Sequence, residues 1–387
     1  MSEYVLLAPQ LFDGEHWYED YALWVADTKI KAVLPTSELP PELMQFTYDG
    51  MLVPGFIDLQ VNGGGGILFN NDPSLKTLEK MLVAHRQYGT TMMLPTLITA
   101  PWQLMEQAVG VVNEAIKRHL PGILGIHLEG PFLNPQRKGA HQPQLMCQLA
   151  TGIVSHLPKL GSGIMLMTLA PELTSESIIK QLITKGVILF AGHSNATEQQ
   201  ANTGFKAGIT GVTHLYNAMS PVTTREPGLV GAALTNDQVW VDIIADGYHV
   251  HPTNMQLAIK CKPAGKVFLV TDAMATVGAN DCNGFMLNGE RIEVSKGRCI
   301  NQQGVLAGAH LGMNQAVKNI LQMTTANLTE ALRMASLYPA AAINQDQQLG
   351  KLKPGFRACV TVLDKTLDVL ATVSDGVVFK NKKMPNE

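Results

Sequence analysis

The sequence predicts an α/β fold, a (β/α)8 TIM barrel with a small β-sandwich domain formed from the N- and C-terminal segments. Eight short apolar runs rich in β-branched residues follow one another through the middle of the chain, and segments with helical spacing stand between several of them. Eight such units over about 290 residues match the size of a TIM barrel. Both ends of the chain alternate apolar and polar residues instead, a pattern typical of strands in a small sheet.

The expected elements follow in chain order. Residues 21–33 predict two strands joined at the polar Asp27-Thr28-Lys29 turn. The expected barrel strands are residues 52–59, 91–97, 123–128, 164–169, 187–191, 211–215, 239–244 and 267–270. Helical spacing predicts helices at residues 75–88, 102–119 and 175–184. The tail returns to strands at residues 359–364, 369–373 and 377–379.

The two β-rich ends predict one small domain of residues 1–52 and 346–387, with a barrel domain of residues 53–345 inserted between them. A doubly wound open sheet is the competing architecture. Its dinucleotide-binding version needs a GxGxxG motif after the first strand, and this sequence has none there. The barrel is therefore the preferred interpretation.

Composition limits the classes of partner. The 387 residues carry 29 Lys+Arg against 32 Asp+Glu, a net charge of −3, so no field favours a nucleic acid or a membrane, and a small molecule fits better. The start lacks a basic region followed by an apolar one, which predicts a cytoplasmic protein. The 5 cysteines are odd in number and widely spaced, which argues against disulfides or a thiolate zinc site.

Polar residues follow the expected barrel strands, whose carboxyl ends meet at one mouth. Glu129, His193 and His214 stand at three of these ends. One carboxylate and two imidazoles bind Zn²⁺ or a similar divalent ion and leave a position open for water. Each residue alone could equally be a hydrogen-bonded group that ends a strand. Their joint placement favours a metal site.

Three further residues are candidates for chemistry. Asp272 ends the last strand, where it could accept a proton from a metal-bound water or could cap the following helix. His141 lies on the loop after the third strand and could donate a hydrogen bond to an anionic oxygen. Arg225 lies on a loop beyond the sixth strand and could grip a phosphate, although a lone loop arginine is more often solvated.

Several motifs in order carry a resemblance to a known family. They are VPGFIDLQVNG at residues 53–63, HLEGP at 127–131, AGHS at 191–194, THLYNAM at 213–219, ADGYH at 245–249 and VTDA at 270–273. With them the chain resembles the amidohydrolase superfamily, and within it the N-acetylglucosamine-6-phosphate deacetylases. The similarity runs nearly from end to end.

The resemblance implies deacetylation of N-acetyl-D-glucosamine 6-phosphate in amino-sugar metabolism. It implies that Glu129, His193 and His214 bind the metal and that Asp272 is the catalytic acid/base. Zn²⁺ is the first expectation, with Fe²⁺, Co²⁺ or Mn²⁺ as alternatives. The implied sugar-phosphate site is lined by Ala140, His141, Asn217, Ala218, Arg225, His249 and Leu306.

The resemblance further implies a homodimer in which His249 reaches the neighbouring subunit's site; assembly beyond a dimer stays open. One departure concerns the first strand, where many superfamily members carry His-x-His and this chain carries Gln60 and Asn62. Amides are poorer ligands than imidazole, so a second metal is doubtful and one ion per subunit is expected.

Two other functions compete with this one. The same barrel and metal set could serve an amidohydrolase of cyclic amides or N-acyl amino acids. A barrel that has lost catalysis could serve as an assembly protein, but the presence of all three ligands and Asp272 argues against that reading.

Overall fold

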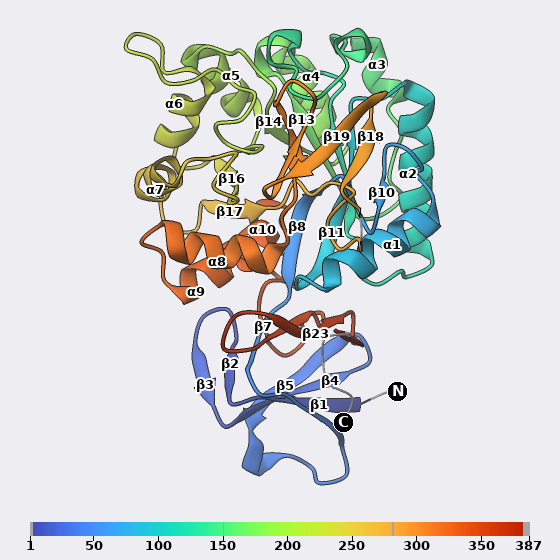
Figure 1. Ribbon diagram of the computed structural model, residues 1–387, viewed down its shortest axis with the longest axis vertical. Helices are drawn as coiled ribbons and strands as arrows, with labels where there is room; N and C mark the ends of the chain where they lie inside the picture. Colours follow the sequence, from blue (N-terminus) through green and yellow to red (C-terminus); the bar gives the residue numbers. More distant parts are fainter. Residues whose placement is uncertain (1–2, 150, 281, 382–387) are drawn as a thin grey trace.

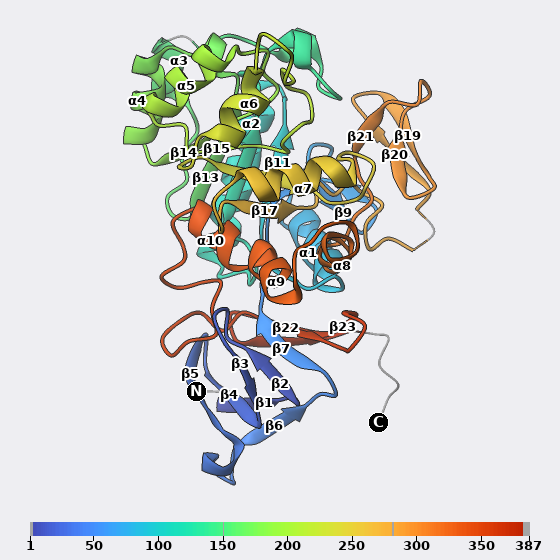
Figure 2. The same ribbon diagram turned by 90° about the vertical axis from the view of Figure 1, so that its left-hand side faces the viewer.

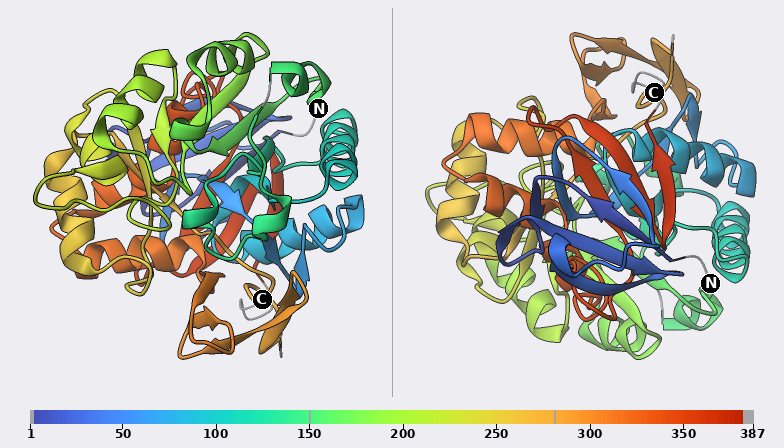
Figure 3. Two further views of the ribbon diagram at one scale, coloured as in Figure 1. Left: turned by 90° about the horizontal axis from the view of Figure 1, so that it is seen from above. Right: turned by 90° about the horizontal axis from the view of Figure 1, so that it is seen from below.

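The computed structural model describes residues 3–149, 151–280 and 282–381. It contains an eight-stranded parallel barrel with a smaller β domain below it in Figure 1. Seen from below, the blue N-terminal and red C-terminal strands of the small domain lie together across one end of the barrel (Figure 3). The predicted fold class is confirmed. None of the described helices combines the length and apolar character that a membrane crossing requires.

The small domain is a sandwich of two sheets with its own apolar core. Leu6, Leu23, Leu52, Val362 and Val373 are buried between the sheets. The four-stranded sheet consists of β1 (Glu3–Leu7), β4 (Tyr21–Ala26), β5 (Lys29–Pro35) and β6 (Met44–Thr47). The six-stranded sheet consists of β2 (Gln10–Phe12), β3 (Trp17–Glu19), β7 (Met51–Pro54), β22 (Val360–Leu363), β23 (Val369–Ser374) and β24 (Val377–Lys380). Both termini therefore contribute to it, whereas the proposed domain boundaries at residues 52 and 346 stay a prediction.

The barrel strands are parallel neighbours in chain order, and the sheet closes between its first and last strands. The strands are β8 (Phe56–Val61), β11 (Thr90–Ile98), β12 (Gly125–Glu129), β13 (Ile164–Leu169), β14 (Val187–Ala191), β15 (Gly211–Val212), β16 (Trp240–Ile244) and β17 (Val267–Val270). At the closure, the backbone N–H groups of Asn62 and Gly63 donate to the Ala273 carbonyl at 2.9 and 3.0 Å. The closure thus lies beside two residues that the sequence singled out, Asn62 and Asp272.

Helices surround the strands, as the view from above shows (Figure 3). Their starts follow local sequence: Ser74 and Thr197 accept hydrogen bonds from backbone N–H groups in the first turns of α1 and α5. The helices are α1 (Leu75–Arg86), α2 (Trp102–Lys117), α3 (Thr151–His156), α4 (Glu176–Thr184), α5 (Glu198–Ala207), α6 (Gly228–Thr235), α7 (Pro252–Cys261), α8 (Met313–Met323), α9 (Leu328–Ala335) and α10 (Leu337–Ala342). Short 3-10 turns are η1 (Thr36–Glu38), η2 (Pro135–Arg137), η3 (Pro143–Leu145) and η4 (Pro171–Leu173).

The first expected barrel strand, residues 52–59, is two strands in the structure. β7 pairs with β22 in the small domain, and β8 begins the barrel after the single residue Gly55. A Cβ at Gly55 would lie 2.2 Å from Thr91 Oγ1, so a glycine fits this close approach. The apolar run continues through the junction because both strands are buried, and the sequence pattern therefore shows no break.

A four-stranded antiparallel sheet beyond β17 was not predicted. It consists of β18 (Gly284–Leu287), β19 (Glu290–Ser295), β20 (Arg298–Ile300) and β21 (Leu306–Ala309). It projects from the side of the barrel in Figure 2. A short hairpin of β9 (Gly63–Gly64) and β10 (Ile67–Leu68) follows β8. The larger sheet matters for function because it supplies part of the cavity described next.

Candidate active site

A cavity with about 670 Å³ of empty space, including its open mouth, lies at the carboxyl ends of the barrel strands. Most of the residues singled out from the sequence line it: Glu129, Ala140, His141, His193, His214, Asn217, Ala218, His249, Asp272 and Leu306. Strand ends bring the charged groups together, and β21 of the unpredicted sheet brings Leu306.

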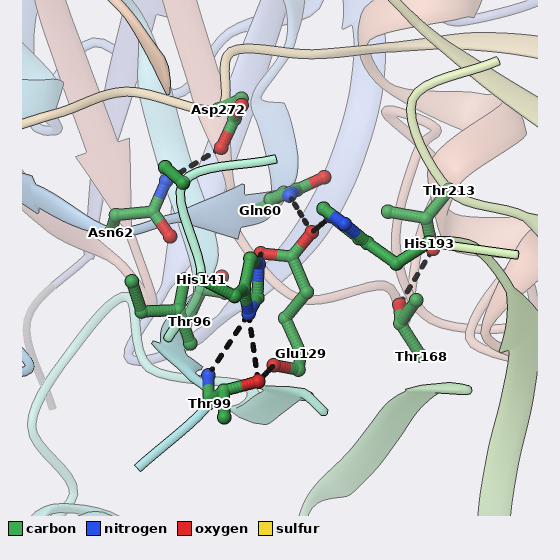
Figure 4. Close-up of polar contacts among 12 residues, drawn as sticks. Gln60, Asn62, Thr96, Thr99, Glu129, His141, Thr168, His193, Thr213 and Asp272 are labelled. Carbon is green, nitrogen blue, oxygen red and sulfur yellow. Dashed lines mark hydrogen bonds and ion pairs between the residues drawn. The ribbon is translucent and has the colours of Figure 1, made fainter. Parts of the chain in front are cut away.

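Glu129, His193 and His214 converge on one point. Glu129 Oε1 lies 3.2 Å from His193 Nε2 and 2.8 Å from His214 Nε2, and the two nitrogens are 3.1 Å apart. All three side chains are buried, and Figure 4 shows Glu129 and His193 facing each other. His193 Nδ1 lies 2.8 Å from the Arg137 carbonyl, which can only accept. The ring's hydrogen is therefore on Nδ1, and the Nε2 lone pair faces the cluster.

The buried Glu129 carboxylate favours positive charge on the groups around it. Burial would raise the pKa of Glu129, but His141, His193 and His214 hold that pKa well below its usual range. Burial would lower the pKa of His214, but the Glu129 carboxylate outweighs it and raises the pKa to about 9. The converging lone pairs and the carboxylate suit a divalent metal ion with histidine and carboxylate ligands.

Gln60 and Asn62 act as hydrogen-bond donors beside the cluster. Gln60 Nε2 donates to Glu129 Oε1 at 3.0 Å, and Asn62 Nδ2 donates to Asp272 Oδ1 at 2.6 Å (Figure 4). Each amide thus orients a carboxylate. This arrangement supports the expectation of one ion per subunit, which stays a prediction.

Asp272 lies partly buried in the cavity, beside the closure of the barrel. Burial and then the charge of Glu129 raise the pKa of Asp272 to about 6. A carboxyl whose pKa lies close to neutrality can both take and return a proton at physiological pH. Its placement in the cavity is what an acid/base role requires.

His141 is a neutral hydrogen-bond donor facing Glu129. Burial lowers the pKa of His141 to about 4, and the nearby His193 ring acts in the same direction. The Thr99 backbone N–H donates to His141 Nδ1 at 3.3 Å, which places the ring hydrogen on Nε2. That nitrogen lies 3.7 Å from Glu129 Oε2. An N–H held in this way can donate to an oxygen in the cavity.

His249 lines the cavity of its own chain. Its Nδ1 lies 2.7 Å from Asp246 Oδ2, and Asp246 Oδ1 accepts the backbone N–H groups of Tyr248 and His249 at 2.8 Å each. Asp246 thereby orients the ring. The expectation that His249 serves a neighbouring subunit differs from this placement and stays a prediction.

Arg225 is exposed on the loop between β15 and α6 and does not line the cavity. The cavity also holds apolar residues that sequence reasoning missed, namely Ile98, Ile244, Met274 and Leu287. Ile98 and Ile244 end β11 and β16, so the rule used for the polar residues could have found them. Leu287 comes from the unpredicted sheet, and no motif signals it.

A model of the amidohydrolase family matches residues 51–384 of this chain. The chain belongs to the amidohydrolase family. This amidohydrolase is 36% identical to the N-acetylglucosamine-6-phosphate deacetylase of Haemophilus influenzae over 377 residues, which cover 97% of this chain and 98% of the relative. It is 42% identical to the N-acetylgalactosamine-6-phosphate deacetylase of a Shewanella species over 323 residues, 83% of this chain and 81% of the relative.

Among solved structures, this amidohydrolase is similar to the crystal structure of N-acetylglucosamine-6-phosphate deacetylase from Pasteurella multocida. The TM-score is 0.94 at 37% identity, and the match covers 98% of this chain and 100% of the other. The family resemblance seen in the sequence motifs is confirmed, and the fold agrees with it over nearly the whole chain.

Proposed function

We propose that this amidohydrolase hydrolyses N-acetyl-D-glucosamine 6-phosphate to D-glucosamine 6-phosphate and acetate. The observation that carries the proposal is the Glu129–His193–His214 cluster in one cavity with Asp272, in a chain similar to deacetylases along nearly its whole length. The test is acetate release from this substrate, measured as purified, after chelation and after metal is added back. No release under any of these conditions would refute the proposal.

The proposed cofactor is one divalent ion per subunit, Zn²⁺ first, held by Glu129, His193 and His214. Such an ion lowers the pKa of a coordinated water and polarises a carbonyl group. The ligand set also suits Fe²⁺, Co²⁺ and Mn²⁺, and availability decides among them. Metal analysis of the protein purified from its own cells identifies the ion.

Asp272 and His141 are the proposed catalytic residues. Asp272 takes a proton from the water that attacks the acetyl carbonyl carbon, while His141 Nε2–H donates to the carbonyl oxygen as negative charge develops there. The C–N bond then breaks, acetate leaves, and Asp272 returns the proton to the sugar nitrogen. The short Asn62–Asp272 hydrogen bond, 2.6 Å, holds the carboxyl group in place for both transfers.

The remaining lining residues are proposed to bind the sugar phosphate. Ala140, Asn217, Ala218 and Leu306 line the cavity around the Glu129–His193–His214 cluster, and His249, which also lines it, is proposed to contact the phosphate. Arg225 is proposed to contact the phosphate from its exposed loop. The protein is further proposed to be a cytoplasmic homodimer.

N-acetyl-D-galactosamine 6-phosphate is the second candidate substrate. The Shewanella relative, which is 42% identical to this chain, is a deacetylase of that sugar phosphate. The two substrates differ only in the configuration at C4, away from the acetamide, so the same catalytic residues serve both. Comparison of kcat/KM on the two epimers in one assay decides between them.

We expect kcat/KM for the sugar phosphate to fall at acidic pH. Asp272 must be ionised to accept a proton, and the pKa of its carboxyl is about 6 in the protein alone. A bound cation favours the ionised form and lowers that pKa. We therefore expect kcat/KM to be level above about pH 6 and to fall at lower pH by about tenfold per pH unit. Steady-state rates measured from pH 4.5 to 8.5, with circular dichroism to exclude acid unfolding, test this. A rate that rises toward acid would contradict it.

Replacement of Arg225 by methionine tests the phosphate contact. The planar guanidinium suits a phosphate and methionine offers no donor, so we expect KM for the phosphorylated sugar to rise about tenfold or more. Unphosphorylated N-acetylglucosamine should be turned over as poorly by the variant as by the wild type. Lys206→Met, which removes an exposed cation near the end of α5 that does not line the cavity, is the control and should leave KM unchanged. Equal losses on both substrates would count against a phosphate role.

A further inference from the structure

Three residues with proposed roles in the reaction hold an uncommon backbone conformation. His193, His214 and Asp272 have positive φ angles of 46°, 36° and 49°. This left-handed region is unfavourable for residues with a side chain, and such residues cluster at functional sites where the surroundings hold them in place. The structure shows what holds each of the three: a carboxylate behind the cavity wall.

Asp58 holds the backbone beside Asp272. Asp58 is fully buried, and its Oδ1 accepts the Thr271 backbone N–H at 3.2 Å. Its Oδ2 accepts the Thr271 hydroxyl at 2.5 Å. The same hydroxyl oxygen accepts the Ala273 backbone N–H at 3.2 Å. Thr271 therefore connects Asp58 to the residues on both sides of Asp272, across the closure between β8 and β17.

Asp242 holds the backbone of His214. Asp242 is buried at the centre of β16, and its Oδ1 accepts the His214 backbone N–H at 2.5 Å. This hydrogen bond fixes the peptide from which the His214 ring extends to Glu129.

Glu172 holds the segment that follows His193. Its Oε1 accepts the Asn195 backbone N–H at 2.6 Å, and its Oε2 accepts the Ser194 hydroxyl at 2.7 Å. Asn134 closes the arrangement: its side-chain amide donates to Glu172 at 2.8 Å and its backbone N–H donates to the His193 carbonyl at 2.9 Å. The carbonyl group of His193 and the two residues that follow it are thereby tied to Glu172.

We propose that Asp58, Asp242 and Glu172, the three rear carboxylates, are positioning residues for the reaction. None of them lines the cavity. Asp242 and Glu172 position the two histidines of the Glu129–His193–His214 cluster, and we call these two the metal arm. Asp58 positions the acid/base Asp272, and we call it the acid/base arm. The acid/base arm rests on the proposed function, whereas the metal arm rests only on the cluster.

The division predicts opposite outcomes for the same chemical change. In Asp242→Asn and Glu172→Gln one acceptor oxygen of the carboxyl group becomes an N–H donor, which disturbs the hydrogen bonds that hold the backbone at His214 and beyond His193. We expect each variant to lower Zn²⁺ affinity about tenfold or more. Asp58→Asn presents an N–H group toward the Thr271 hydroxyl, which loses its acceptor. We expect it to keep Zn²⁺ affinity within about twofold and, with saturating Zn²⁺, to lower kcat about tenfold or more with KM nearly unchanged.

The measurements are competition for Zn²⁺ against a chromophoric chelator and acetate release with saturating Zn²⁺. The three variants serve as controls for one another because each replaces a carboxylate by its amide. Equal effects of all three on affinity, or effects on thermal stability alone, would overturn the proposal. If the wild type released no acetate, the proposed function would be wrong. The comparison of Zn²⁺ affinities needs no substrate, so it would still test the roles of Asp242 and Glu172.

Thr271 provides a second test of the acid/base arm, should Asp58→Asn fail to fold. Thr271→Val removes the connecting hydroxyl and should lower kcat as Asp58→Asn does, and Thr271→Ser should restore it. Thr361→Val is the matched control: Thr361 is equally buried, donates to the Gly89 carbonyl at 2.6 Å and accepts the Phe56 N–H at 3.3 Å, away from the cavity. Equal losses of kcat in Thr271→Val and Thr361→Val would overturn the assignment.

Discussion

We expect Asp272→Asn to lose about a thousandfold or more in kcat while it keeps its metal and its affinity for substrate. The amide has nearly the shape of the carboxyl group and can still contact Asn62, but it cannot take a proton from water. Because Asp272 is proposed to take the proton in one step and return it in the next, both steps fail. Acetate release measures the loss, elemental analysis measures the metal, and calorimetry with the sugar phosphate measures binding.

The control for Asp272→Asn is Asp246→Asn. Asp246 is also partly buried and hydrogen-bonded, but its partner is His249, not Asn62. We expect this variant to change binding more than chemistry. Full turnover by Asp272→Asn with the metal still bound would show that another group carries the proton.

The same substitution should stabilise the metal-free protein. The pKa of Asp272 is raised to about 6 in the folded chain, against about 3.9 for an unfolded aspartate. The folded state therefore holds the proton to higher pH, so stability falls as the pH rises from about 4 to about 6 and is level above that. Asparagine does not titrate. Urea unfolding without metal should show the variant to be more stable than the wild type at pH 7 and equal to it near pH 4.

The charged part of the site could be predicted from the strand ends, because a closed parallel barrel fixes where the carboxyl end of each strand lies. Glu129 is the last residue of β12, and His193 and Asp272 lie two residues beyond β14 and β17. Closure of the sheet brings these ends together whatever their separation in the chain. The type of residue and its distance from a strand end were therefore sufficient to predict the cluster.

Other parts of the site depend on features that local sequence does not encode. The β18–β21 sheet, which carries Leu306 to the cavity, has no counterpart in the barrel pattern. The boundary between β7 and β8 at Gly55 does not show in the hydrophobic pattern, because both strands are buried. The contacts of Asp242 and Glu172 join positions 28 and 22 residues apart, and only the closed barrel shows which backbone N–H or hydroxyl group each carboxylate accepts.

The second large effect is expected for Glu129→Gln, which should lower metal affinity about a thousandfold or more and abolish turnover at ordinary metal concentrations. Glu129 is the only carboxylate of the cluster, and an amide oxygen is a poor ligand. The variant should be purified nearly metal-free, and it should recover little activity when Zn²⁺ is added. Chelator competition and acetate release provide the two measurements.

Thermal unfolding of the same variant separates loss of the ion from loss of the fold. A ligand that binds only the folded state stabilises it by about 4 kcal/mol at a thousand times its dissociation constant, so chelation should lower the melting temperature of the wild type. Glu129→Gln should melt at one temperature with or without chelator, because it has no ion to lose. Asp246→Asn, whose carboxylate lies outside the cluster, should respond to chelator as the wild type does. A chelator-sensitive Glu129→Gln with wild-type turnover would mean that the ion is held elsewhere, and the assignment of Glu129, His193 and His214 as its ligands would fall with it.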